Sequence, residues 1–150
     1  RLNGFKTCMK DAGLQVDDEL IWEAKAKNFG DVSTVKLGRE GAHQLFSLKN
    51  PPTAIITVND MYAFGVYAGA RDLGVKIPKD VSVVGVDNLT LGEVVEPPLT
   101  TAEQPLEEMA KLAVEKLMER LQEQSTGSQM KCELKAKLIV RESTAVCGIR

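Results

Sequence analysis

The sequence predicts an α/β domain built around a parallel sheet. Two apolar, β-branched runs, Thr53–Val58 and Val81–Val86, have the composition of strands that are buried on both faces. Between them a helical pattern begins near Asp60, continues to about Leu73 and stops at Gly74. A strand, a helix and a second strand in this order are typical of a right-handed crossover between parallel strands.

Length and composition favour one globular domain. The 150 residues carry a net charge of −2, with 43% hydrophobic and 27% charged residues. No uncharged apolar run reaches the roughly 18 residues of a membrane span, so we expect no membrane insertion. The 19 basic and 21 acidic residues leave no excess for binding nucleic acid unaided. Three cysteines without metal-ligand spacing favour a reducing compartment over a disulfide framework or a zinc site.

The segment before this unit is expected to contain two helices and a short strand. Apolar residues at helical spacing predict a first helix over Leu2–Ala12 that ends at Gly13. Leu20–Ala24 has the pattern of a short strand. A second helix is expected over Gly38–Leu48, and the Asn50–Pro52 break closes it.

The second half of the chain changes character. Asn88–Pro98 shows no periodicity and ends in two prolines that favour extended backbone. An amphipathic helix is expected over Pro105–Glu123, followed by a polar linker over Gln124–Gln129. Apolar and charged residues alternate over Lys131–Val140, which predicts an edge strand adjoining the other three in one sheet.

Polar residues follow both buried strands. Asn59 and Asp60 come after the first strand, and Asp87 and Asn88 come after the second. Ligands bind at the carboxyl ends of parallel strands, which lie about 4.8 Å apart, so we expect Asn59 and Asp87 to point into one crevice. An amide and a carboxylate without a nucleophile suit the binding of ligand hydroxyls. Asp60 is expected to cap the next helix, and Asn88 to form a turn.

Enzymatic signatures are missing from the sequence. There is no dinucleotide-binding glycine motif, no phosphate-binding loop and no nucleophile elbow. The single histidine, His43, is expected on the solvated side of a helix, where no catalytic triad can be built around it. We therefore expect a binding protein that is not an enzyme and has no cofactor and no metal.

Five segments occur in a characteristic order: Arg1–Phe5, Pro52–Asp60, Ile77–Asn88, Pro97–Thr101 and Val140–Thr144. Their order and spacing resemble those of lac-repressor-type (LacI/GalR) transcription regulators, and the match extends over nearly the whole chain. The effector domains of these regulators resemble periplasmic sugar-binding proteins, in which two α/β lobes enclose a small molecule.

The resemblance implies a truncated, parallel-sheet lobe of the type I periplasmic-binding-protein-like fold. Residues 1–96 and 131–150 would form the C-terminal lobe of the effector domain. Residues 97–130 would supply a crossover and one helix of the N-terminal lobe. The DNA-binding head and the opening strand of the C-terminal lobe would lie upstream of Arg1.

The resemblance also implies a site and its partners. By similarity, the effector-contacting positions fall on Arg1, Phe29, Asn59, Asp87 and Gln104. Charged groups give directional bonds to ligand hydroxyls or a carboxylate, and an aromatic ring gives a platform for a sugar face or a purine. The implied partners are a small-molecule effector of carbohydrate type, operator DNA bound through the upstream head, and a second subunit in a cytoplasmic homodimer. Effector binding would change operator affinity allosterically.

Two other function classes remain open at the level of sequence. The sugar-binding receptor of an ABC transporter shares the fold and would carry a secretory signal upstream. An enzyme of flavodoxin-like architecture would need a phosphate loop or a catalytic pair.

The apolar stripe of the Pro105–Glu123 helix gives one further expectation. It should dock on the chain's own sheet or, more favourably, on a second copy of the chain.

Overall fold

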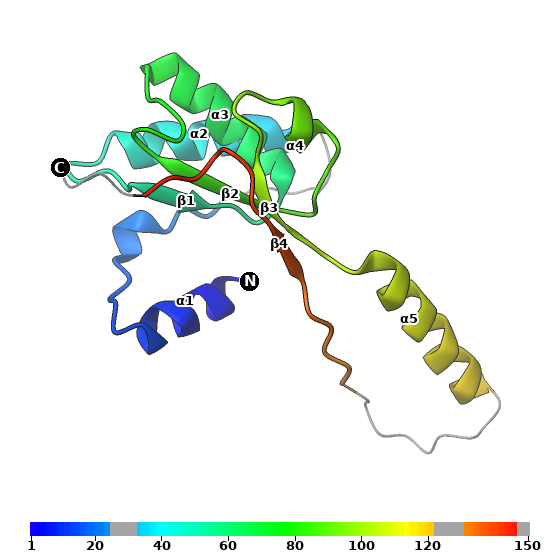
Figure 1. The fold of residues 1–150 in the computed structure, drawn as a ribbon. Helices are drawn as coiled ribbons and strands as arrows, with labels where there is room; N and C mark the ends of the chain where they lie inside the picture. Colours follow the sequence, from blue (N-terminus) through cyan, green and yellow to red (C-terminus); the bar gives the residue numbers. More distant parts are fainter. Residues whose placement is uncertain (25–32, 122–130, 147–150) are drawn as a thin grey trace.

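A four-stranded sheet organises the chain, as the computed structural model shows (Figure 1). The structure describes residues 1–24, 33–121 and 131–146. The strands are β1 (Ala54–Ile56), β2 (Ser82–Val86), β3 (Thr100–Glu103) and β4 (Lys137–Ile139). They lie in the order β1-β2-β3-β4, with the first three parallel and β4 antiparallel to β3. The predicted α/β class is confirmed.

The two apolar runs form neighbouring parallel strands, as predicted. Ile55 of β1 is paired in register with Val83 of β2, and both side chains are buried. Val84 is in turn paired with Thr100 of β3. β-branched side chains suit this position because their restricted rotamers fit the pleated surface. The expected burial on both faces is wrong, because only alternate residues of β1 and β2 are buried.

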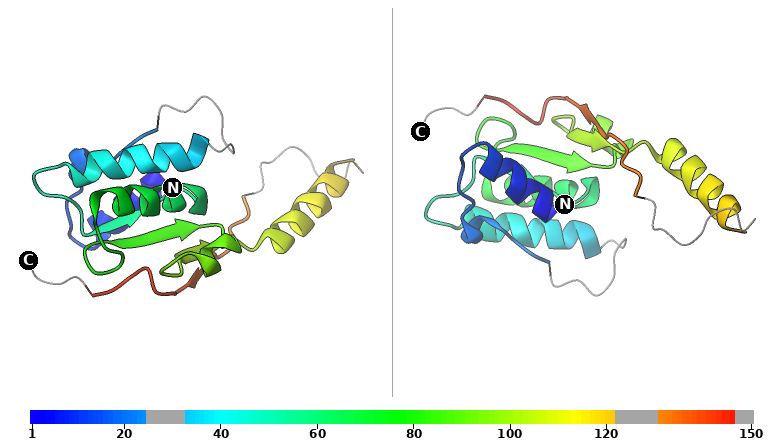
Figure 2. Two further views of the ribbon diagram at one scale, coloured as in Figure 1. Left: turned by 90° about the horizontal axis from the view of Figure 1, so that it is seen from above. Right: turned by 90° about the horizontal axis from the view of Figure 1, so that it is seen from below.

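Two helices, α2 (Ser33–Phe46) and α3 (Asp60–Leu73), pack side by side on one face of the sheet (Figures 1 and 2). They approach closely where Gly38 faces Gly65, since a Cβ on Gly38 would lie 2.3 Å from the Tyr62 carbonyl oxygen. The predicted end of α3 is confirmed at Gly74, which has a left-handed φ of 69°. The buried core beneath these helices consists of Ala42, Leu45, Ile55, Ala63, Phe64, Val66, Val81, Val83 and Leu99.

The opposite face of the sheet carries only the N-terminal segment among the described residues. Helix α1 (Leu2–Asp11) lies beneath the sheet in Figure 1, and the view from below in Figure 2 agrees. None of its residues is buried. Ile56, whose side chain faces this side, is 61% exposed, so this face is loosely covered.

The strand predicted over Leu20–Ala24 is wrong. A 3₁₀ turn, η1 (Asp18–Leu20), begins there because the Asp17 side chain accepts a hydrogen bond from the Glu19 amide. Among the described residues the sheet ends at β1, and the segment after η1 does not pair with this edge strand. Instead, Trp22 in that segment packs against Gly41 of α2.

Two elements occur where the sequence showed no periodicity. Helix α4 (Leu91–Val94) is a single turn inside the aperiodic Asn88–Pro98 stretch. Strand β3 follows, and its pattern was missed because Thr100 and Thr101 are polar yet only 2% and 0% exposed. Both hydroxyl groups are hydrogen-bonded, that of Thr101 to the buried Asp60 and that of Thr100 to the Arg141 amide, which lets a polar strand occupy the middle of the sheet.

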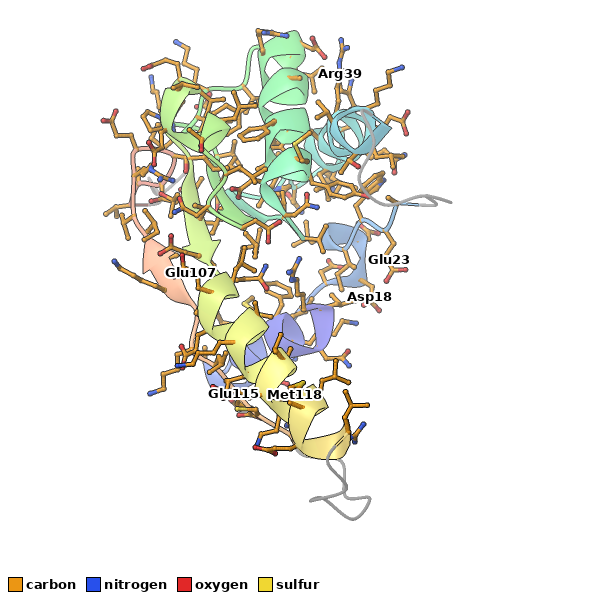
Figure 3. All side chains as sticks on the ribbon, turned by 90° about the vertical axis from the view of Figure 1, so that its right-hand side faces the viewer. Asp18, Glu23, Arg39, Glu107, Glu115 and Met118 are labelled. Carbon is orange, nitrogen blue, oxygen red and sulfur yellow. The ribbon has the colours of Figure 1, made fainter. Side chains whose placement is uncertain are left out.

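Helix α5 (Leu106–Leu121) extends away from the sheet in every view (Figures 1 and 2). In Figure 3, the labelled Glu107, Glu115 and Met118 lie along it, far from Arg39 on α2. No α5 residue is buried, so docking of its stripe on the chain's own sheet was wrongly expected. Docking on a second copy stays a prediction, as does the division of the chain between two lobes.

The last strand lies at the edge of the sheet, as predicted, but it is shorter than Lys131–Val140. Only Lys137–Ile139 lie opposite β3, and the backbone needs a partner strand to form a ladder.

None of the helices in the part of the chain that the structure describes has the length and apolarity of a membrane span.

Candidate functional site

The carboxyl ends of β1, β2 and β3 place three of the predicted residues along one edge of the sheet. Asn59 follows β1, Asp87 directly follows β2, and Gln104 directly follows β3. Since β1, β2 and β3 are adjacent and parallel, these positions come from three consecutive strands. This is the edge at which open parallel sheets bind ligands.

Asp87 is the centre of the site. Gln104 donates a hydrogen bond from Nε2 to Oδ1 of Asp87 at 2.5 Å. Arg1 also approaches this carboxylate, with Nη2 3.9 Å from the same oxygen, and its Nη1 donates to the carbonyl of Val58. The side chains of Arg1 and Asp87 are 50% and 29% exposed, so a ligand can reach both. The structure thus brings together Arg1, Asp87 and Gln104.

Asn59 has a structural role at the same edge. Its Oδ1 accepts a hydrogen bond from the Tyr62 amide at 3.0 Å, so Asn59 is the N-cap of α3. The prediction that Asp60 caps this helix is wrong, because Asp60 is the first helical residue. Contact of Asn59 with a ligand stays a prediction, and Phe29 lies outside the described residues.

The backbone after β2 has an unusual conformation. Asp87 and Asn88 have positive φ angles of 114° and 53°, which residues other than glycine rarely adopt. The left-handed conformation of Asn88 agrees with its predicted turn. Its side chain accepts from Arg141 at 2.8 Å and donates to Glu103 at 2.8 Å. Strained backbone of this kind concentrates at functional sites, where surrounding contacts maintain it.

The sequence did not indicate the residues that support this loop. Asp60 is fully buried, and it bonds both Leu89 of the loop and Thr101 of β3. Arg141, whose side chain is 14% exposed, bonds the Leu99 carbonyl as well as Asn88. The only sequence signal was their position inside the segments Pro52–Asp60, Pro97–Thr101 and Val140–Thr144, which carry the family resemblance.

His43 lies at the molecular surface, as predicted, but it has an unpredicted partner. Its Nε2 lies 3.0 Å from Oδ2 of Asp72, which Arg39 also contacts. Hydrogen bonds from His43 and Arg39 lower the pKa of the Asp72 carboxyl. This cluster joins α2 to the C-terminal end of α3, whereas the loop that carries Asp87 lies at the N-terminal end of α3. Within the described ranges, no group of three or more His, Cys, Asp or Glu residues is arranged to hold a metal ion.

Comparison with known proteins gives the site its context. The periplasmic binding protein-like domain matches residues 1–144. The chain belongs to this family. Its relatives include the HTH-type transcriptional repressor PurR of Photobacterium profundum, which is 36% identical over 143 residues, 95% of this chain and 40% of PurR. The HTH-type transcriptional repressor CytR of Escherichia coli K12 is 36% identical over 147 residues, 96% of this chain and 40% of CytR.

Solved structures of transcription regulators are similar to this chain as well. A complex of the transcriptional regulator CelR with cellobiose superposes with a TM-score of 0.78 at 29% identity, over 95% of this chain and 41% of CelR. A LacI-family regulatory protein from Chloroflexus aggregans gives 0.81 at 29% identity, over 97% of this chain and 50% of that one. The chain spans 40% of the length of the curated relatives. The resemblance to lac-repressor-type regulators and the predicted fold are confirmed.

Proposed function

We propose that this chain is the effector-sensing part of a LacI-type transcription regulator and that its effector is a sugar or a sugar-like molecule. The observation that carries the proposal is the Asp87 carboxylate, which follows β2 and is approached by both Arg1 and Gln104. The similarity to CelR, which was solved with cellobiose, supports a carbohydrate. The repressors PurR and CytR favour a regulator over a transport receptor or an enzyme.

The chemistry of the edge suits a polyhydroxylated ligand. An ionised carboxylate accepts several hydrogen bonds, so Asp87 can bind two adjacent hydroxyl groups of a sugar. Arg1 and Gln104 supply donors for other oxygen atoms of the ligand. Because both already contact Asp87, a bound sugar would take the place of these contacts. By the family resemblance, Phe29 would add an apolar surface for the sugar ring.

The position of Gln104 connects ligand binding to the rest of the regulator. Gln104 lies two residues before α5, which in the proposed architecture belongs to the N-terminal lobe. A ligand that binds Asp87 would release Gln104 and favour a different lobe orientation. In a homodimer of the complete regulator, that change would alter the affinity of upstream DNA-binding heads for operator DNA. The proposed location of such a regulator is the cytoplasm.

The test is calorimetric titration of the complete regulator with cellobiose and a panel of monosaccharides and disaccharides. Asp87→Ala should weaken binding at least thirtyfold, because losing a buried charge-assisted bond typically costs about 2 to 5 kcal/mol. Asp72→Ala is a matched control. It also removes a carboxylate paired with arginine, 22% exposed, but near the far end of α3, about 18 Å along the helix from Asp60. An affinity within about threefold of wild type for Asp87→Ala would contradict the site, since that is under 1 kcal/mol.

A further inference from the structure

The loop that carries Asp87, residues 87–89, is fixed through three consecutive backbone amides. The Asp87 amide donates to the Ala102 carbonyl at 2.9 Å. The Asn88 amide donates to the Thr101 hydroxyl at 3.2 Å, and the Leu89 amide donates to Oδ2 of Asp60 at 2.8 Å. Only the first of these acceptors is an ordinary strand carbonyl. The other two are side chains from α3 and β3.

One side-chain acceptor is the Asp60 carboxylate itself, and the other, the Thr101 hydroxyl, is bonded to it. The Thr101 hydroxyl donates to Oδ1 of Asp60 at 2.7 Å. A hydroxyl has one hydrogen, so donating it to Asp60 leaves its lone pairs for the Asn88 amide. Asp60 therefore holds Leu89 directly and Asn88 through Thr101. Asp60 and Thr101 are both 0% exposed, which excludes water as a competing partner.

The surrounding fold makes room for this carboxylate. A Cβ on Gly85 of β2 would lie 2.1 Å from Oδ1 of Asp60, so a larger residue at Gly85 would displace it. Burying a carboxylate is unfavourable unless hydrogen bonds and local dipoles compensate. Two hydrogen bonds and the N-terminal end of α3 do so here. Since Asn59 already caps the helix, capping does not account for the buried charge.

We propose that Asp60, acting through Thr101, is the positioning residue that holds Asp87 in its positive-φ conformation and directs its carboxylate to Gln104 and the ligand. The role of Asp60 in holding the loop does not depend on a ligand, whereas its role in ligand binding rests on the proposed function.

The first experiment is amide hydrogen exchange, measured by NMR on the 150-residue chain. Thr101→Val keeps the shape of the side chain and removes the hydroxyl, whereas Thr101→Ser keeps the hydroxyl and is the matched control. In Thr101→Val we expect the exchange rates of the Asn88 and Leu89 amides to rise at least about tenfold more than those of Ile55 and Val83 in the core, whose rates follow the loss of global stability. Wild-type rates at Asn88 and Leu89 would overturn the proposal, as would an equal rise at all four amides.

The second readout is the side-chain amide of Gln104. If the loop directs Asp87 at Gln104, then Thr101→Val and Asp60→Asn should both move the Gln104 Nε2 proton signals toward those of a solvated glutamine. Thr101→Ser should leave these signals in place. An unchanged Gln104 signal beside a loosened loop would show that the network does not position the carboxylate. Thr101→Val alone suffices for this comparison if Asp60→Asn fails to fold.

A sugar titration then separates this proposal from the proposed function. In the complete regulator, with cellobiose as the probe, Thr101→Val should weaken binding at least about tenfold and Thr101→Ser by less than about threefold. If wild type does not bind cellobiose but the exchange and Gln104 results hold, cellobiose is not the ligand and the role of Asp60 in holding the loop stands. If wild type binds and Thr101→Val matches it despite a loosened loop, the positioning role for the ligand is overturned.

Discussion

The edge that carries Asp87 and the projecting helix α5 invert the usual relation between polarity and burial. At the edge, Asp60 and Thr101 are each 0% exposed, and each is hydrogen-bonded. On α5 six large apolar side chains are 43% to 68% exposed; they are Leu106, Met109, Val114, Leu117, Met118 and Leu121. The first region has its partners within the chain, whereas no α5 residue is buried by the other described residues.

This difference shows which part of the fold is stabilised by contacts within the chain. The buried polar groups are stable because each donor and acceptor has a partner from another element of the same sheet. Helix α5 depends on backbone hydrogen bonds and on local pairs such as Lys116 with Glu119, at 2.8 Å. A helix of this length is marginal without tertiary packing. We therefore expect core substitutions to affect stability and α5 substitutions to affect association.

The largest expected effect compares one leucine from each region. Leu99→Ala should lower the free energy of unfolding by about 2 to 5 kcal/mol, because Leu99 is 0% exposed and its loss leaves a cavity. Leu117→Ala should change it by less than about 0.5 kcal/mol, since Leu117 is 57% exposed. Urea denaturation at low protein concentration measures both. Similar losses of unfolding free energy in the two variants would contradict the expected difference between the core and α5.

The next effect concerns association through α5. We expect the chain to form dimers at high micromolar concentration, because the exposed stripe on α5 gains stability from burial against a second copy. Leu117→Lys should raise the dimer dissociation constant more than about tenfold, as measured by light scattering. Leu14→Lys is the control, since Leu14 is 56% exposed but lies beyond α1. A monomeric wild-type chain would contradict the prediction.

A smaller loss is expected from removing a buried hydroxyl group. Ser143 donates from Oγ to the Val83 carbonyl at 2.6 Å and accepts from the Thr100 amide at 2.7 Å. Ser143→Ala leaves both backbone groups without this partner and should cost about 1 to 3 kcal/mol in urea unfolding. Ser47→Ala removes an exposed hydroxyl that bonds the carbonyl of His43, and it should cost less than about 0.5 kcal/mol. Equal losses of unfolding free energy in the two variants would show that burial of the hydroxyl group does not determine the cost of removing it.

The smallest expected effect is a pH dependence at the far end of α3. His43 and Arg39 lower the pKa of Asp72 below its ordinary value of 3.8. A carboxyl group whose pKa is lower in the folded state stabilises the fold above its unfolded pKa, and this stabilisation is lost as pH falls through the folded pKa. Asp72→Asn should therefore unfold with a weaker dependence on pH below about 4. An unchanged acid-unfolding profile in this variant would contradict the role of the pair.

The strands and helices that depend on local pattern could be predicted from the sequence. β1, β2 and α3 follow from apolar periodicity, and Gly74 ends α3 because it adopts positive φ without steric cost. The strand expected at Leu20–Ala24 was wrong because a strand needs a neighbouring backbone, which pattern alone does not supply. β3 was missed for the opposite reason, since its threonines are buried through partners that lie far away in sequence.

The site was predictable to the extent that it depends on strand order. Adjacent parallel strands brought Asp87 to the expected edge, and the family resemblance added Arg1 and Gln104. The role of Asp60 was not predictable, because a helix-starting aspartate looks the same in sequence whether it faces solvent or the core. Its burial depends on Gly85 and Thr101, which approach it only in the folded sheet.

Trp22 is the only tryptophan in the sequence, and it lies against Gly41 of α2, whose added Cβ would be 2.7 Å from the indole ring. Indole emission shifts to longer wavelength when the ring meets water, so the chain carries an intrinsic optical reporter of this contact. The reporter sits in the segment that joins α1 to the helical layer. Because Arg1 at the start of α1 reaches Asp87, displacement of that segment by a ligand would register in the fluorescence spectrum of an unlabelled sample.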